Sequence, residues 1–313
     1  MNILITGGCG YVGTILTERL LKQNHKITVI DTQWFGNFLN KNKELTTIKD
    51  DVRNIDSYDL NGFEIIIHLA NIANDPAVDL DPNLSWEVNC LATHRLIDKS
   101  TRSGVKQFIY ASSGSVYGIK EEKDVTEDLP LVPISTYNKT KMIAERIILS
   151  YQNKIKTHII RPATVCGYSP RMRLDVSVNM LTMQALINQK ITVFGGQQTR
   201  PNIHMSDMIR VYEHFINMPN LEQGCYNAGF ENISILDIAY QVKKRVPCEI
   251  IISESNDKRS YRQNSDKLMR TGFVQKYFIK NAIEEIIEKY ENGILEDKEE
   301  FYTIKTMKKL LRN

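Results

Sequence analysis

Residues 6–13 read Thr-Gly-Gly-Cys-Gly-Tyr-Val-Gly, and this stretch decides the fold that the sequence predicts. Gly7, Gly10 and Gly13 form a G-x-x-G-x-x-G pattern between an apolar run at 2–6 and an amphipathic segment at 11–23. Glycine permits a tight strand-to-helix turn and lets backbone N–H groups approach a pyrophosphate. The helix N-terminus then offers unpaired N–H groups to the anion. The pattern predicts a dinucleotide-binding turn, although glycines at such a turn can also serve packing alone.

An acidic residue after the second apolar run strengthens this prediction. Asp31 follows the glycine turn by about 20 residues, where a carboxylate accepts hydrogen bonds from the adenosine ribose. The next residues are Thr32, Gln33 and Trp34, with no arginine to bind a 2′-phosphate. We therefore expect NAD and not NADP. The alternative is that Asp31 is an ordinary turn residue at a strand end.

Apolar runs alternate with amphipathic segments through residue 160. We expect strands at 2–6, 26–31, 46–49, 64–70, 107–112 and 156–160, and helices at 11–23, 83–103 and 135–152. This alternation predicts an α/β fold with a doubly wound parallel sheet of the Rossmann type, whose ligand lies beyond the carboxyl ends of the strands. Later loops lengthen, and the stretch 281–312 is helical and polar. We expect an NAD-binding domain at 1–165 and a smaller, mainly substrate-binding lobe at 166–313, with the chain crossing between them.

The composition excludes several classes of protein. The 313 residues are 42% hydrophobic and carry a net charge of only +3, without the cationic face of a nucleic-acid protein. No apolar stretch approaches the roughly 20 residues of a membrane span, and the apolar start lacks the basic leader of a signal peptide. The five cysteines are dispersed, which favours reduced thiols in the cytoplasm and argues against a zinc site or any other metal.

A second pattern, Tyr-Asn-Lys-Thr-Lys, occupies residues 137–141. On a helix Tyr137 and Lys141 share a face, because they are four residues apart. An ammonium and a cationic nicotinamide nearby would lower the phenol's pKa, so that Tyr137 could act as a general base. Upstream, an apolar strand ends in hydroxyl residues at 110–118, and Ser113 could hydrogen-bond the reacting oxygen. Each pattern alone is also typical of a surface helix or a strand-capping loop.

Together these motifs resemble the extended short-chain dehydrogenases, the nucleotide-sugar epimerase/dehydratase family, over essentially the whole chain. The resemblance implies that Ser113, Tyr137 and Lys141 are the catalytic triad, with Lys141 also holding the nicotinamide ribose. Besides Tyr137 and Lys141, it implies cofactor contacts from Gly7, Gly10, Tyr11, Val12, Gly13, Asp31, Asp51, Val52, Leu69 and Ala70. Asn89 resembles a residue that orders the active-site backbone, although helix packing explains it equally well.

The substrate side departs from the family dehydratases. Those enzymes carry an Asp-Glu pair after the hydroxyl that matches Ser113, whereas this chain has Gly114 and Ser115. Without an acid and a base to expel water, we expect oxidation, reduction or epimerisation at the sugar C4. The resemblance implies substrate contacts from Ser115, Asn179, Arg200, Arg259 and Arg262. Arginine suits a diphosphate, but any one of these arginines could be a solvated surface charge. Asp207 is expected to cap the following helix.

Residues 161–173 read Arg-Pro-Ala-Thr-Val-Cys-Gly-Tyr-Ser-Pro-Arg-Met-Arg, and this segment resembles a smaller group of enzymes within the family. They are similar to enzymes of bacterial capsule polysaccharide pathways that oxidise the C4 hydroxyl of a GDP-heptose, so we expect a dehydrogenase acting on a GDP-sugar. A 4-epimerase, a 4-keto-sugar reductase and a non-catalytic NAD-binding regulator are the alternatives. Arg171 and Arg173 add charge to a loop that faces the substrate or a partner subunit, and Arg161 is expected to brace the fold. The helices at 83–103 and 135–152 correspond to those that pair across family homodimers.

Overall fold

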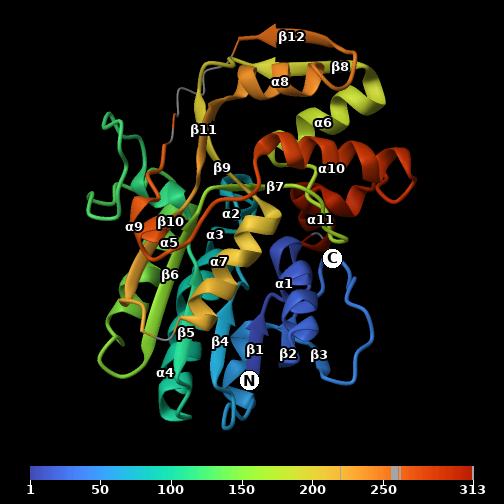
Figure 1. Ribbon diagram of the computed structural model, residues 1–313. Coiled ribbons are helices and arrows are strands. Elements are labelled where there is room, and N and C mark those ends of the chain that lie inside the picture. Colours follow the sequence, from blue (N-terminus) through green and yellow to red (C-terminus); the bar gives the residue numbers. More distant parts are fainter. Residues whose placement is uncertain (219, 255–259, 261, 312–313) are drawn as a thin grey trace.

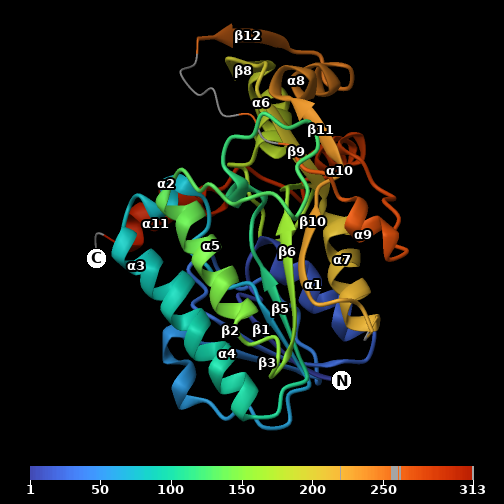
Figure 2. The same cartoon turned by 90° about the vertical axis from the view of Figure 1, so that its left-hand side faces the viewer.

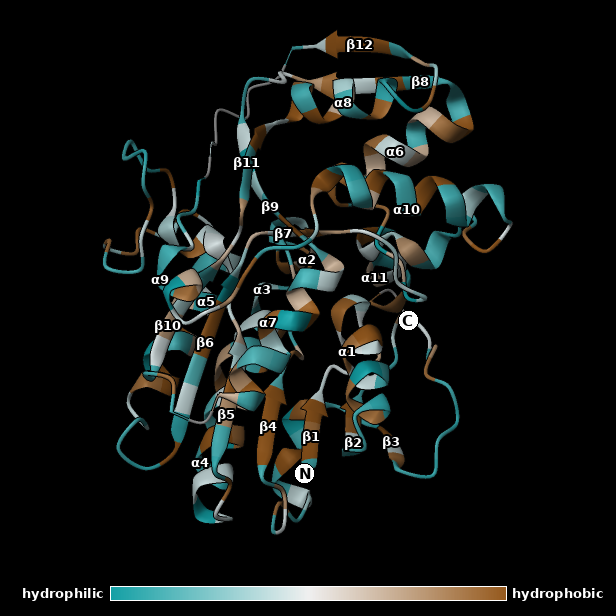
Figure 3. Ribbon diagram, viewed as in Figure 1, coloured by the Kyte–Doolittle hydropathy of each residue, from teal (hydrophilic) through white to brown (hydrophobic). Residues whose placement is uncertain are grey.

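A seven-stranded parallel sheet forms the centre of the computed structural model, which describes residues 1–218, 220–254, 260 and 262–311 (Figure 1). In spatial order its strands are β10 (Gly224–Ala228), β6 (Lys156–Pro162), β5 (Gln107–Ala111), β4 (Ile65–His68), β1 (Asn2–Thr6), β2 (Lys26–Asp31) and β3 (Leu45–Lys49). Figure 3 shows hydrophobic residues along β1 and β4, at the middle of the sheet. Such continuous apolar strands are typical of a parallel sheet buried on both faces. The predicted doubly wound fold is confirmed.

Helices cover both faces of this sheet (Figure 2). One face is covered by α1 (Tyr11–Lys22) and α7 (Met205–Asn217). The other is covered by α3 (Pro82–Trp86), η2 (Glu87–Ala92), α4 (Thr93–Arg102), α5 (Thr136–Leu149) and the short η1 (Val52–Ser57). Each layer buries its own apolar cluster against the strands, and the carboxyl strand ends stay free to form a site.

A smaller lobe lies beyond those strand ends. It contains a three-stranded sheet of β7 (Thr164–Cys166), β9 (Thr199–His204) and β11 (Glu231–Ser234), and a two-stranded sheet of β8 (Lys190–Phe194) and β12 (Glu249–Ser253). Its helices are α6 (Ser177–Asn188), α8 (Ile235–Lys243) and α10 (Ile279–Glu291).

The chain passes between the two parts several times after residue 165. The strand β10 pairs with β6 at one edge of the central sheet, and α7 packs on one face of that sheet. The last helix, α11 (Thr303–Leu310), packs against α2 (Asp75–Val78) (Figure 2). The remaining short elements are η3 (Gly114–Tyr117), α9 (Asp266–Arg270) and η4 (Glu299–Phe301). Among the described residues no helix is both long and apolar enough to cross a membrane.

Three local expectations differ from the structure. The stretch 281–312, expected to be helical, is divided into α10 and α11 by residues 292–302, which contain only the short η4. The helix expected at 83–103 is interrupted at η2, which is a single π-helical segment between α3 and α4. The expectation that Asp207 caps α7 is wrong: the cap is His204, whose ring accepts the Ser206 N–H. The fully buried Asp207 carboxylate instead accepts the backbone N–H groups of Lys276 (2.9 Å) and Tyr277 (2.8 Å). The carboxylate at this position therefore accepts two backbone hydrogen bonds from a chain segment that is distant in the sequence.

Candidate active site

A cavity of about 600 Å³ opens where the carboxyl ends of the central strands face the smaller lobe. It is lined by the glycine turn, the ends of β4, β5 and β6, the loop before α6, and α11. Sites that enclose small molecules commonly measure about 300–1,000 Å³. The cavity therefore has the size and the place that a doubly wound sheet provides for a ligand.

The glycine turn at one end of the cavity leaves an open helix N-terminus. Gly7 has a φ of +77°, and a Cβ there would lie 2.5 Å from the backbone nitrogen of Ala70. A Cβ on Gly13 would lie 2.3 Å from the Gly7 carbonyl oxygen. Gly10 is the N-cap of α1 and offers no side-chain hydrogen bond, so the first N–H groups of the helix remain available to an anion. This cradle fits the pyrophosphate of a dinucleotide.

Asp31 lies beside this turn at the end of β2. Its Oδ2 accepts the Cys9 N–H (3.0 Å) and its Oδ1 accepts the Gln33 N–H (2.7 Å). Burial raises the pKa of Asp31, and the two backbone hydrogen bonds oppose that rise. Each carboxylate oxygen keeps a further lone pair. The geometry is compatible with the predicted ribose contact.

The other predicted cofactor contacts divide into two groups. Tyr11, Val12 and Leu69 line the cavity. Asp51 lies off the cavity wall and caps η1 by accepting the Arg53 N–H (2.8 Å), and Val52 is buried in the core. Their contact with adenine stays a prediction. Ala70 also lies off the wall, since its backbone packs against the glycine turn.

The three predicted catalytic residues meet at the end of β5. Ser113 and Tyr137 line the cavity, and the Ser113 hydroxyl lies 2.8 Å from the hydroxyl of Ser115. Lys141 is 3% exposed, and its Nζ donates to the Ala111 carbonyl oxygen (2.6 Å). The same Nζ lies 5.9 Å from the centre of the Tyr137 ring. A phenol and a hydroxyl thus face the cavity, and a buried amine lies close to the phenol ring.

Burial governs the protonation of this group. It raises the pKa of Tyr137 to about 12, while the side chain of Ser113 and the positive charge of Arg173 act in the opposite direction. It lowers the pKa of Lys141 to about 7. Burial outweighs the charges of the protein that act on Tyr137, and the expected acidification of the phenol by Lys141 together with a cationic nicotinamide stays a prediction. A phenolate near neutral pH requires a further positive charge, such as an oxidised nicotinamide beside the ring.

Asn89 connects two segments that border the catalytic corner. Asn89 lies in η2, and its Oδ1 accepts the Ile72 N–H (2.8 Å). Its Nδ2 donates to the Ile72 carbonyl (3.1 Å) and to the Thr140 hydroxyl (3.0 Å). Asn89 is fully buried, so these bonds have no competition from water. It joins the loop after β4 to the helix that carries the catalytic pair, which favours the ordering role over simple helix packing.

The position after Ser113 has no room for a side chain. A Cβ on Gly114 would lie 2.3 Å from Nε2 of Gln263, which is 4% exposed and donates to the Arg161 carbonyl (3.0 Å). Ser115 lines the cavity and donates to Oδ1 of Asn138 (2.7 Å). The place where the related dehydratases carry an acid is thus closed by packing. Sequence reasoning missed Gln263, which lies far along the chain and belongs to no motif.

Asn179 does not face the cavity as a diphosphate contact would. It is fully buried, and its Oδ1 accepts the Gly167 N–H (3.0 Å). Its Nδ2 donates to the Tyr11 hydroxyl (3.0 Å) and to the Arg173 carbonyl (2.9 Å). The amide is therefore engaged inside the protein, where it ties the loop before α6 to the glycine turn.

The predicted arginines have different surroundings. Arg200 lines the cavity from β9. Arg262 is exposed and off the cavity wall, and Arg259 lies outside the described residues. Arg161 forms a buried two-point ion pair with Glu145, at 2.9 Å and 2.7 Å, consistent with its expected bracing role. Of the predicted diphosphate contacts, Arg200 is the arginine that reaches the cavity in the described part of the chain.

Several further residues line the cavity, among them two arginines of the loop that was expected to face the substrate or a partner subunit. Arg171 and Arg173 come from the loop before α6, and Arg173 pairs with Asp175 (2.9 Å). Trp34 and Phe35, in the loop after Asp31, also line the cavity. Two adjacent aromatic residues in a polar loop are a sequence signal that could have identified them as site residues. The contribution of α11 had no such signal, because its sequence is polar and far from every motif.

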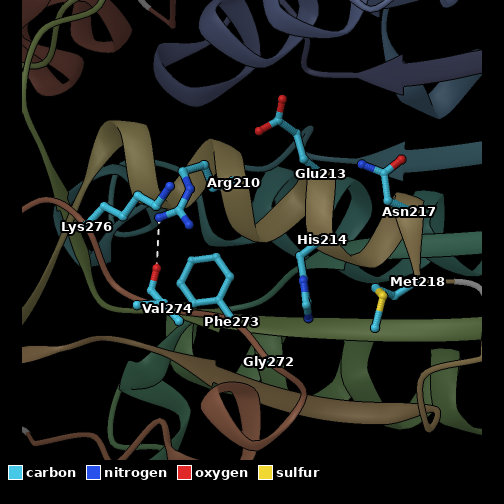
Figure 4. A pocket seen from close by; sticks show the side chains of 9 residues that line it. All are labelled: Arg210, Glu213, His214, Asn217, Met218, Gly272, Phe273, Val274 and Lys276. Carbon is cyan, nitrogen blue, oxygen red and sulfur yellow. Dashed lines mark hydrogen bonds between the residues drawn. The ribbon is translucent and has the colours of Figure 1, made fainter.

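A second depression of about 350 Å³ lies along α7, outside this cavity (Figure 4). Arg210 donates to the Val274 carbonyl across it (2.9 Å). It contains none of the predicted site residues. Within the described ranges, no group of three or more His, Cys, Asp or Glu side chains could hold a metal ion.

The fold and the cavity define a dinucleotide-binding protein of the Rossmann class with a Tyr/Lys pair at the strand ends. The chain belongs to the NAD dependent epimerase/dehydratase family, whose profile matches residues 3–229. The expected NAD dependence is thereby confirmed at the level of the family. The chain is an enzyme of a family that acts on nucleotide sugars.

Named relatives agree with the assignment of the chain to this family. The chain is 32% identical over 260 residues to a protein of Bacillus subtilis named as an uncharacterized UDP-glucose epimerase, covering 76% of this chain and 80% of the relative. The UDP-glucuronic acid 4-epimerase of Bacillus cereus, solved with NAD, is 26% identical with a TM-score of 0.81, covering 94% of this chain and all (100%) of that one. The UDP-glucose 4-epimerase of Thermotoga maritima shares the fold, with a TM-score of 0.85, 21% identity and coverage of 94% and 100%.

Proposed function

We propose that this protein oxidises the C4 hydroxyl of a nucleotide-activated sugar. One observation carries the proposal: Ser113 and Tyr137 line the same cavity as the glycine turn and Arg200. That cavity could hold a dinucleotide and a sugar diphosphate in contact with each other. Ser115 would then contact the sugar, and Arg200 the substrate's diphosphate.

Side chains of the protein itself would accept the proton of the sugar hydroxyl and hold its oxygen. Bound NAD supplies the hydride acceptor. Tyr137 takes the proton of the C4 hydroxyl, and Ser113 holds the same oxygen through a hydrogen bond. Lys141 is anchored at the Ala111 carbonyl and supports the ribose next to the phenol. Arg173 adds a positive charge that favours the phenolate.

The narrower proposal is a GDP-D-glycero-D-manno-heptose 4-dehydrogenase of capsule polysaccharide biosynthesis, in the cytoplasm. It is supported by the similarity of residues 161–173 to such enzymes and by the two arginines that this segment contributes to the cavity wall. The closed space at Gly114 argues against a dehydratase. The five described cysteines are free thiols, which is compatible with a reducing compartment.

A nucleotide-sugar 4-epimerase is the second candidate. The named relatives from the two Bacillus species favour it. The two reactions share the first step and differ in whether the keto sugar leaves or takes the hydride back on its other face. A 4-keto-sugar reductase would run the first step in reverse.

The proposal is tested by giving the purified protein GDP-, UDP-, CMP- and dTDP-sugars. Native mass spectrometry reports the retained cofactor and the preferred nucleotide. A dehydrogenase yields NADH and a 4-keto sugar, whereas an epimerase yields the C4 epimer with no net NADH. Tyr137→Phe should lose roughly 10²–10⁴-fold in kcat. Tyr240→Phe, at an exposed tyrosine of α8, is the matched control. Wild-type turnover in Tyr137→Phe would refute the assigned base.

A further inference from the structure

Arg171 is a buried cation without an acidic partner. It is 3% exposed, its Nε has no hydrogen-bond partner, and its Nη1 donates only to the carbonyl of the adjacent Met172 (3.2 Å). Arg173, two residues further on, is paired with Asp175 at 2.9 Å. Among the described residues no carboxylate lies within ion-pairing distance of Arg171. Burying a charge without a counter-charge is costly, so this guanidinium points to an anion that it receives from a ligand.

The surroundings of Arg171 indicate which anion. Its guanidinium carbon lies 4.1 Å from the centre of the Phe35 ring, and both side chains line the cavity. The charges of Arg173, Asp175, Asp31 and Tyr11 act on it, in that order of size. The guanidinium thus shares the cavity wall with the glycine turn at the N-terminus of α1, and the charge of the carboxylate suited to the adenosine ribose acts on it. In a dinucleotide, the group between the ribose and that helix N-terminus is the pyrophosphate.

The loop that carries Arg171 is fastened on both sides. The Gly167 carbonyl accepts the Tyr11 hydroxyl (2.6 Å) ahead of Arg171, and the Arg173 carbonyl accepts the Asn179 amide (2.9 Å) behind it. Asn179 also donates to the same Tyr11 hydroxyl (3.0 Å). The backbone of this loop is thus tied to Tyr11, the first residue of α1, and the buried side chain of Arg171 has little side-chain entropy left to lose on binding.

We propose that Arg171 binds the NAD pyrophosphate from the face opposite the glycine turn, so that the diphosphate is held from two sides. The proposal rests on the NAD site of the proposed function and adds to it a contact from the smaller lobe. The planar guanidinium can donate to both phosphates, and the ligand's negative charge supplies the counter-ion that the described residues lack. The substrate diphosphate has a separate candidate in Arg200.

The test measures affinity and stability, independent of turnover. The full chain is stripped of dinucleotide and titrated with NAD by calorimetry as wild type, Arg171→Met, Arg171→Lys and Arg245→Met. Arg245 pairs with Glu284 and does not line the cavity, so its variant is the control. Losing a charged hydrogen bond should weaken NAD binding roughly 10- to 100-fold in Arg171→Met. Arg171→Lys should be intermediate, and Arg245→Met unchanged.

The ligand-free Tm separates a binding role from a structural one. Arg171→Met should melt at the wild-type temperature or above, because it removes an uncompensated buried charge. A lower ligand-free Tm in both Arg171 variants, or failure of both to fold, overturns the proposal, and so does an unchanged NAD affinity. A loss confined to NADP would assign Arg171 to a 2′-phosphate, and a loss confined to GDP or UDP would assign it to the substrate; either result overturns it. Absence of turnover with every nucleotide sugar would refute only the proposed reaction.

Discussion

The side-chain amide of Gln263 occupies the space that a side chain at Gly114 would need. A Cβ on Gly114 would lie 2.3 Å from Nε2 and 2.7 Å from Cδ of Gln263. Gln263 cannot easily move, because it is buried and its Nε2 donates to the Arg161 carbonyl (3.0 Å). The loop beside the catalytic serine is therefore shaped by a residue from the far end of the chain. The absence of an acid there has a packing cause as well as a chemical one.

Gly114→Ala should lower the free energy of unfolding by roughly 1–3 kcal/mol, since it overpacks a closed site. Gln263→Ala removes the obstructing amide. The double variant should therefore be more stable than the sum of the two single effects predicts, because neighbouring sites couple. Urea denaturation of the four proteins measures this coupling. Strictly additive effects would show that the two positions do not compete for space.

The burial of Lys141 should make stability depend on pH. Burial lowers the pKa of Lys141 in the folded state to about 7, whereas its ordinary pKa is 10.5. Between these values the unfolded chain binds more protons, so stability rises with pH, and the full penalty applies below the folded pKa. The free energy of unfolding should increase from about pH 7 to about pH 8.5, below the range where most thiols titrate. Lys141→Met should flatten this increase in urea denaturation; an equally steep rise in that variant would contradict the assignment.

Asn89→Ala should leave the Ile72 backbone groups and the Thr140 hydroxyl without partners in a buried site. We expect a loss of roughly 2–4 kcal/mol in the free energy of unfolding and a lower kcat. Asn83→Ala, at an exposed position of α3, should change stability by less than about 0.5 kcal/mol. Chemical denaturation and steady-state kinetics compare the two. If both variants behave alike, Asn89 does not order the active-site backbone.

The expected homodimer has a candidate surface. Trp86, Leu91 and Ile143 are large apolar residues of α3, η2 and α5 that are 37%, 56% and 36% exposed. Helices of this face should pair between two copies and cover them. Leu91→Arg should then shift the mass measured by light scattering toward the monomer. Phe194→Arg, at a residue of β8 that is 58% exposed, should not. A monomeric wild type would reject the dimer.

The elements of the central sheet were predictable because their signals are local. The strand expected at 26–31 has the observed bounds of β2, since six consecutive residues carry the pattern. The strand expected at 64–70 ends instead at His68, where the chain turns toward Asn89. The π segment η2 was not predictable, because the helical spacing of 83–103 is the same with or without it.

The sequence by itself determined the dinucleotide turn, the acid after the second strand and the Tyr/Lys pair, because glycine conformation and helical spacing act over a few residues. Only the tertiary structure decided that Asn179 is engaged inside the protein, that Gln263 closes the space at Gly114 and that Arg171 is buried without an ion-pair partner among the described residues. These relationships join residues far apart in the chain. They arise from the packing of the smaller lobe on the sheet, and local sequence patterns do not encode such contacts.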